Sequence, residues 1–83
     1  MPETGKYVYI LESLPFPGKR YTGVTINLKS RIAAHNAGQS AYTSRYKPWK
    51  ISTAIWFEDN KKADAFEKYL KSGSGRAFSK RHF

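Results

Sequence analysis

Five side chains that could take part in chemistry stand in segments that the sequence pattern assigns to strands and helices. They are Tyr9, Tyr21, Arg31, His35 and Glu67. The carboxylate of Glu67 could hold a hard divalent cation, because such ions commonly bind one or two carboxylates together with substrate phosphate and water. It could also form a structural salt bridge with Arg31. The five residues therefore indicate either a site that handles phosphate or polar groups packed in the core.

The two tyrosines would be positioned by a pair of strands. Two β-branched and aromatic runs are separated by a segment with two prolines and a glycine, which predicts a turn. These runs are residues 6–11 and 18–25. A hairpin centred on Pro15 would set Tyr9 and Tyr21 opposite each other on one face of the sheet, although strand tyrosines are usually packing residues. Gly23 inside the second run indicates close approach by another backbone or by a ligand.

A helix is predicted to carry Arg31 and His35. Residues 28–37 have helical periodicity, with Asn27 as a candidate N-cap and Gly38 just beyond the end. At 100° per residue, both polar side chains project within about 60° of the apolar stripe. They could be a snorkelling arginine and a packed, hydrogen-bonded histidine, or members of a functional site.

The second half of the chain predicts a loop over residues 39–50, a strand over 51–57 and a helix up to Gly73 that Asp59 or Asn60 would cap. Glu67 falls on the apolar side of that helix. The C-terminal residues have room for a short basic helical turn. The order strand, strand, helix, strand, helix predicts one α+β domain over residues 1–83, a small antiparallel sheet flanked by helices.

The charge balance favours a polyanionic partner. Fifteen Lys and Arg against six Asp and Glu give a formal net charge of +9. Such a positive field attracts nucleic acid first, with acidic lipid or protein surfaces as the alternative. Charge alone does not distinguish a protein that only binds nucleic acid from one that acts on it.

Composition also bears on location. The chain has no cysteine, which excludes disulfides and thiolate metal sites and suits a cytoplasmic, intracellular protein. Its longest apolar run, residues 7–11, is far short of the roughly 20 residues that a membrane span needs, and its first residues lack a signal-peptide core. We therefore expect a soluble protein that has no membrane partner.

The ordered set of residues resembles the GIY-YIG nuclease family. Tyr7, Val8 and Tyr9 stand in the place of the first motif, and Tyr21, Thr22 and Gly23 stand in the place of the second. Arg31, His35 and Glu67 follow in the family's order, and the segment LKSGSGRAF is typical of small stand-alone members. The resemblance implies a three-stranded antiparallel sheet with flanking helices and hydrolysis of a DNA phosphodiester with one metal ion.

The resemblance also implies a role for each site residue. Tyr9 and Tyr21 would face the scissile phosphate, one of them acting as, or hydrogen-bonding to, the base that activates water. Arg31 would neutralise charge on the transition state, and Glu67 would hold one Mg²⁺ or Mn²⁺ ion. His35 would relay a proton or orient a tyrosine.

Contacts to nucleic acid are expected from cations interleaved with aromatic residues. The predicted contacts are Lys29, Arg45, Lys47, Trp49, Lys50 and Arg76. The interleaved aromatic residues, Tyr42, Tyr46 and Trp49, could instead close a thin core. The resulting hypothesis is a metal-dependent DNA endonuclease, structure-directed or weakly sequence-specific, acting in DNA repair or processing. The alternative is a module of the same fold that binds without cutting. A monomer or weak homodimer is expected, with a protein partner for targeting.

Overall fold

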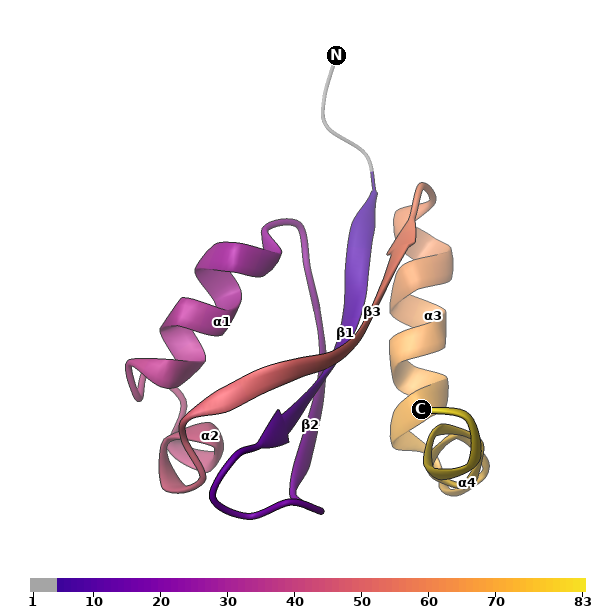
Figure 1. Cartoon of the computed structure of the whole chain (residues 1–83). Helices are drawn as coiled ribbons and strands as arrows, with labels where there is room; N and C mark the ends of the chain where they lie inside the picture. Colours follow the sequence, from indigo (N-terminus) through magenta and orange to yellow (C-terminus); the bar gives the residue numbers. More distant parts are fainter. Residues whose placement is uncertain (1–4) are drawn as a thin grey trace.

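The computed structural model describes residues 5–83 and is built around a three-stranded antiparallel sheet (Figure 1). The central strand is β1 (Lys6–Ser13), and β2 (Arg20–Thr25) and β3 (Trp49–Phe57) form the two edges. The predicted α+β class, with a small antiparallel sheet flanked by helices, is confirmed. None of the helices within the described residues is long and apolar enough to cross a membrane.

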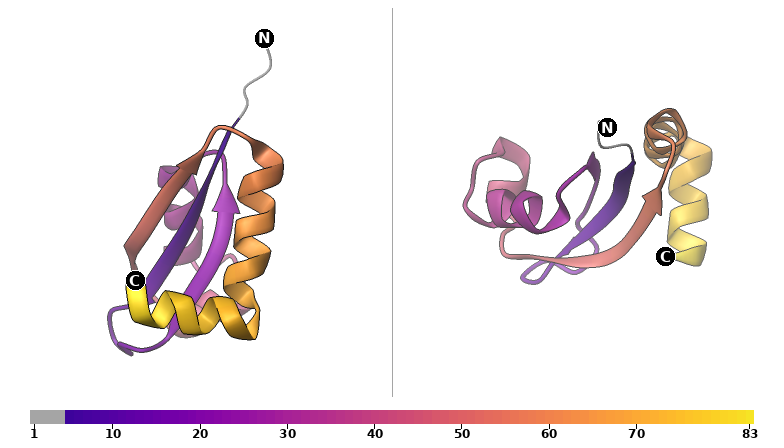
Figure 2. Two further views of the ribbon diagram at one scale, coloured as in Figure 1. Left: turned by 90° about the vertical axis from the view of Figure 1, so that its right-hand side faces the viewer. Right: turned by 90° about the horizontal axis from the view of Figure 1, so that it is seen from above.

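Helices cover both faces of the sheet, as Figures 1 and 2 show. One face carries α1 (Leu28–Asn36) and α2 (Ala41–Arg45), and the other carries α3 (Asn60–Lys71) and α4 (Gly73–His82). The central strand must therefore be apolar on both sides. Its run of buried residues meets this requirement, because successive side chains point to opposite faces of a sheet.

Each face of β1 has its own core. Val8 and Ile10 pack with Ala63 and Leu70 beneath α3 and α4. Tyr9 and Leu11 point the other way and join a second cluster beneath α1 and α2, which contains Trp49, Tyr21, Leu28, Ile32 and Tyr46. The side of the sheet with α1 and α2 is thus the side on which the predicted tyrosines lie.

The helix ends largely follow the sequence signals. The Asn27 side chain accepts a hydrogen bond from the Ser30 backbone N–H at 3.0 Å, so the predicted N-cap of α1 is confirmed. Asp59 caps α3 in the same way. Ser72 ends α3 and caps α4 through the Gly75 backbone N–H, which lets α4 turn sharply away from α3.

Two local predictions were wrong. Residues 39–50 are not all loop, since the five-residue helix α2 is too short to show apolar periodicity. The helix expected at the C-terminus is confirmed and is longer than a single turn: α4 has ten residues, although its two glycines lower its helix propensity. Gly75 is needed there because a Cβ would collide with the Tyr69 carbonyl. Finally, β3 begins at Trp49, two residues earlier than predicted.

The hairpin register also differs from the prediction. Tyr9 pairs with Gly23, and Tyr21 pairs with Leu11, so the hairpin is centred on Phe16 and the tyrosines are diagonal neighbours on one face. The close approach at Gly23 comes from a side chain and not from another backbone or a ligand. A Cβ at Gly23 would lie 2.5 Å from the Tyr9 hydroxyl oxygen and 2.6 Å from its Cζ.

The substitution Gly23→Ala should therefore destabilise the protein. A buried aromatic ring cannot move aside freely, and such overpacking costs about 1 to 3 kcal/mol in the free energy of unfolding. Urea unfolding measures this, with Gly73→Ala as the control because a Cβ there meets nothing within 4 Å. Equal stability of the two variants would contradict the steric account.

Candidate active site

A buried chain of hydrogen bonds links β1, α1 and α2. The Tyr9 hydroxyl lies 3.0 Å from Nε2 of His35, and Nδ1 of His35 lies 2.9 Å from the Thr43 hydroxyl. The exposed fractions of these residues are 2%, 4% and 0%, respectively. His35 is thus packed and hydrogen-bonded, as one of the two alternatives from the sequence required, and its part in a reaction stays a prediction.

The partners of Thr43 fix the direction of this chain. The Ser40 carbonyl can only accept a hydrogen bond, so the Thr43 hydroxyl, 3.5 Å away, donates to it. Its oxygen is then left to accept the Nδ1–H of His35. In that tautomer, which is assigned from the network, Nε2 is unprotonated and accepts the Tyr9 O–H.

Burial keeps both ionisable members of the chain neutral. It raises the pKa of Tyr9 far above 10.0; Tyr21 and Glu67 act in the same direction, while the positive charge of Arg31 opposes them. Burial also lowers the pKa of His35 below 6.5, and Arg31 adds to this effect. Tyr9 is therefore suited to donate a hydrogen bond and poorly suited to act as a base at neutral pH.

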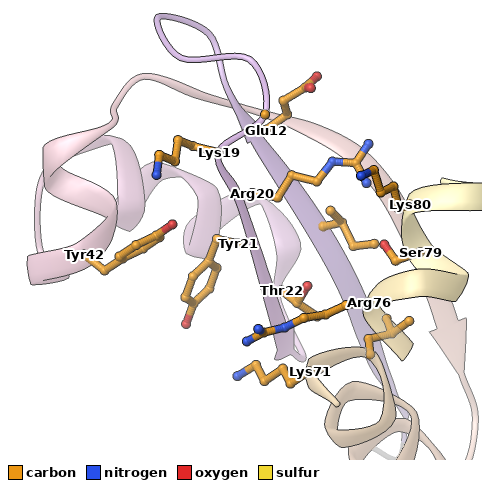
Figure 3. A pocket seen from close by; sticks show the side chains of 13 residues that line it. Glu12, Lys19, Arg20, Tyr21, Thr22, Tyr42, Lys71, Arg76, Ser79 and Lys80 are labelled. Carbon is orange, nitrogen blue, oxygen red and sulfur yellow. The ribbon is translucent and has the colours of Figure 1, made fainter. Parts of the chain in front are cut away.

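Tyr21 is the more accessible of the two tyrosines. It is half-buried, and its ring centre lies 4.8 Å from that of His35 and 6.3 Å from that of Tyr9. It also lines a groove of about 880 Å³ that crosses the edge strand β2, named here the β2 groove (Figure 3). Solvent and a substrate in that groove can reach Tyr21, whereas Tyr9 lies beneath it.

The two charged candidates occupy different settings. Arg31 is exposed, one helical turn before His35, and its positive charge acts on both Tyr9 and His35. Glu67 is 14% exposed in its side chain and pairs with Lys71 at 2.5 Å. Among the described residues its ion pair is with Lys71, so the alternative of a structural bridge to Arg31 was wrong. Both charges still act on the Tyr9 phenol.

The donors fit only one kind of metal site. Residues 5–83 contain no group of three or more histidine, aspartate or glutamate side chains that could hold an ion. A single carboxylate, Glu67, suits a hard cation that keeps its waters and takes further oxygens from substrate phosphate. Lys71 is 48% exposed in its side chain, so it can move off the carboxylate.

The predicted nucleic-acid contacts lie in different settings. Arg76 lines the β2 groove, and the predicted lysines and Arg45 are exposed. Lys50 pairs with Glu12 at 3.6 Å. Trp49 is buried, and its indole N–H donates to the Thr43 carbonyl at 2.7 Å, so this ring closes the core and is not free to stack on bases.

Several residues around the site were missed by sequence reasoning. Lys71 follows Glu67 by four residues, a spacing that predicts an ion pair on a helix. Thr43 gave no signal, since its position depends on α2. The remaining missed residues are Lys19 and Arg20, which line the β2 groove.

Comparison with known proteins agrees with this geometry. The GIY-YIG catalytic domain family matches residues 5–81, so the chain belongs to the GIY-YIG family of nuclease domains. A UPF0213 protein of Clostridium perfringens is 44% identical over 70 residues, covering 78% of this chain and 69% of its own. Another, encoded upstream of ldhD in Pediococcus acidilactici, is 36% identical over 75 residues, covering 87% and 74%. No solved structure is a match.

The pKa of His35 predicts a dependence of stability on pH. Because the folded state holds His35 neutral, the unfolded chain takes up this proton first as the pH falls through about 6.5. The free energy of unfolding should therefore decrease below that pH, by at most about 1.4 kcal/mol per pH unit from this group. Urea unfolding between about pH 7.5 and pH 5 should show a smaller slope for His35→Gln than for wild type. Equal slopes would contradict a buried, neutral His35.

Proposed function

We propose that this chain is a divalent-metal-dependent DNA endonuclease. The observation that supports the proposal most strongly is the position of Tyr21, which adjoins the buried Tyr9–His35 pair and lines a basic groove. A groove with a cationic lining suits a phosphate backbone. The proposed biological setting is DNA repair or processing, with cleavage directed by DNA structure more than by sequence.

Each residue has a distinct part in the proposed reaction. Tyr21, once its phenol has given its proton to solvent in the groove, would orient the attacking water and accept a proton from it at the mouth of the site. Tyr9, kept neutral by burial and hydrogen-bonded to His35, would fix the positions of Tyr21 and the water. Arg31, exposed and positively charged, would stabilise the charge that develops on the phosphate, a contribution of about 3 to 4 kcal/mol for a preorganised donor.

Glu67 is the residue that would hold the metal ion. Mg²⁺ or Mn²⁺ bound there supplies Lewis-acid polarisation of the phosphate oxygen. Lys71 would have to leave the carboxylate when the ion binds, and it could then contact the DNA backbone. A monomer with one such site would cut one strand in each encounter.

A binding module of the same fold is the second candidate. The 2.5 Å ion pair between Glu67 and Lys71 favours it, because a neutralised carboxylate is a weaker metal ligand. The two functions differ in metal dependence. An enzyme loses turnover in EDTA, whereas a binder keeps an affinity that falls with salt.

The direct test is cleavage of supercoiled plasmid and of a labelled branched duplex with Mg²⁺ or Mn²⁺. Wild type and Glu58→Gln should cut, and EDTA should stop both. Glu67→Gln, which keeps the shape but removes the charge, should lose about 100-fold or more in rate. Glu58 is a matched control because it is exposed and lies outside the site.

Two results would count against the proposal. Cutting by Glu67→Gln at the wild-type rate would remove Glu67 from the reaction and point to a contaminating nuclease. The absence of cutting by folded wild type, with DNA binding retained, would leave the binding module as the function.

A further inference from the structure

The β2 groove is lined by several cations to which the proposed reaction gives no role. It crosses the outer edge of β2, between α2 on one side and the corner of α3 and α4 on the other (Figure 3). Its lining contains five cations and one acid. These cations are Lys19, Arg20, Lys71, Arg76 and Lys80, and the acid is Glu12, which pairs with Lys50. The groove is therefore a strongly positive channel that leads to Tyr21.

Two cations on α4 are available to a ligand. Arg20 donates to the Phe83 carbonyl at 2.8 Å, and Lys71 is paired with Glu67. Arg76 and Lys80 are exposed and form no ion pair with another described residue. They stand one helical turn apart on α4, so they can contact neighbouring phosphates of one strand.

An aromatic platform forms the opposite side of the groove. The Tyr42 ring is 44% exposed and lies 6.3 Å from the Tyr21 ring at an angle of 32°. Tyr46 at 5.3 Å and Trp49 at 6.4 Å also pack against this ring, so it is held in place although much of it is exposed. Supported rings of this kind stack on unpaired bases.

We propose that the β2 groove binds an unpaired DNA strand. One base stacks on Tyr42, the backbone runs past Tyr21, and Arg76 and Lys80 contact the following phosphates. The groove volume lies within the range of pockets that enclose small ligands, about 300 to 1,000 Å³, which suits a short length of single strand. In a duplex the bases are stacked on each other and cannot reach Tyr42. This inference rests on the proposed nuclease function and gives it a substrate class, DNA with an unpaired segment next to the cut.

The test is fluorescence anisotropy in EDTA with a labelled thymidine oligonucleotide of about 12 nucleotides and a duplex of the same length. Arg76→Gln combined with Lys80→Gln should weaken binding of the single strand about tenfold and reduce the salt slope by about 1.4. Lys61→Gln combined with Lys62→Gln is the matched control. It removes the same charge at the start of α3, outside the groove, and should have a much smaller effect.

Tyr42 is tested separately. Tyr42→Leu should lower the affinity for the single strand about fivefold or more while leaving duplex binding unchanged, and Tyr42→Phe should bind as wild type. A thermal unfolding curve for each variant identifies any loss of fold. If Tyr42→Leu does not fold, quenching of 2-aminopurine in the oligonucleotide by wild-type protein decides whether a base stacks.

Three outcomes would overturn the inference. The first is an equal loss of single-strand affinity in the two double variants. The second is an equal affinity of wild type for the single strand and the duplex. The third is competition by polyglutamate that is as strong as competition by the unlabelled oligonucleotide. The inference and the nuclease function can fail separately. If the Arg76→Gln, Lys80→Gln variant cleaves DNA with an unchanged KM, the inference alone is refuted. If that variant loses single-strand binding but wild type does not cleave, only the nuclease function is refuted.

Discussion

The hydrogen-bond chain from Tyr9 through His35 to Thr43 is the constraint on which the rest of the site depends. Burying three polar side chains is unfavourable unless each finds a partner, and leaving one unsatisfied costs about 1 to 3 kcal/mol. Every buried polar side-chain atom in the described part of the molecule has a partner. Since the three residues come from β1, α1 and α2, satisfying them fixes both helices against the sheet.

The two tyrosines beside this hydrogen-bond chain have different environments. Tyr9 can lie flat under the site because its neighbour across the hairpin is Gly23. Burial then holds it as a neutral hydrogen-bond donor, while Tyr21, one step along the diagonal, faces the β2 groove. The edge strand β2 thus brings the Tyr21 side chain and a basic channel into one region, and the channel is also lined by Lys71, the ion-pair partner of Glu67.

Much of this arrangement could be predicted from the sequence, and the parts that could not share a physical cause. The period of two along strands put Tyr9 and Tyr21 on one face, and Asn27 marked the start of α1. The register depended on turn geometry that the two prolines and the glycine did not specify. Thr43 depends on α2, a helix held by the Trp49 indole and not by its own periodicity. Partners that come from tertiary packing leave no local pattern to detect.

The measurement that most directly tests the account compares single-turnover cleavage of a branched duplex by Tyr21→Phe and Tyr9→Phe. Both changes keep the ring and remove only the hydroxyl. If Tyr21 carries the reacting hydroxyl and Tyr9 only positions it, Tyr21→Phe should lose about 100-fold or more in rate and Tyr9→Phe about tenfold. A larger loss of rate in Tyr9→Phe than in Tyr21→Phe, or a rate near wild type in Tyr21→Phe, would contradict the roles assigned to the two tyrosines.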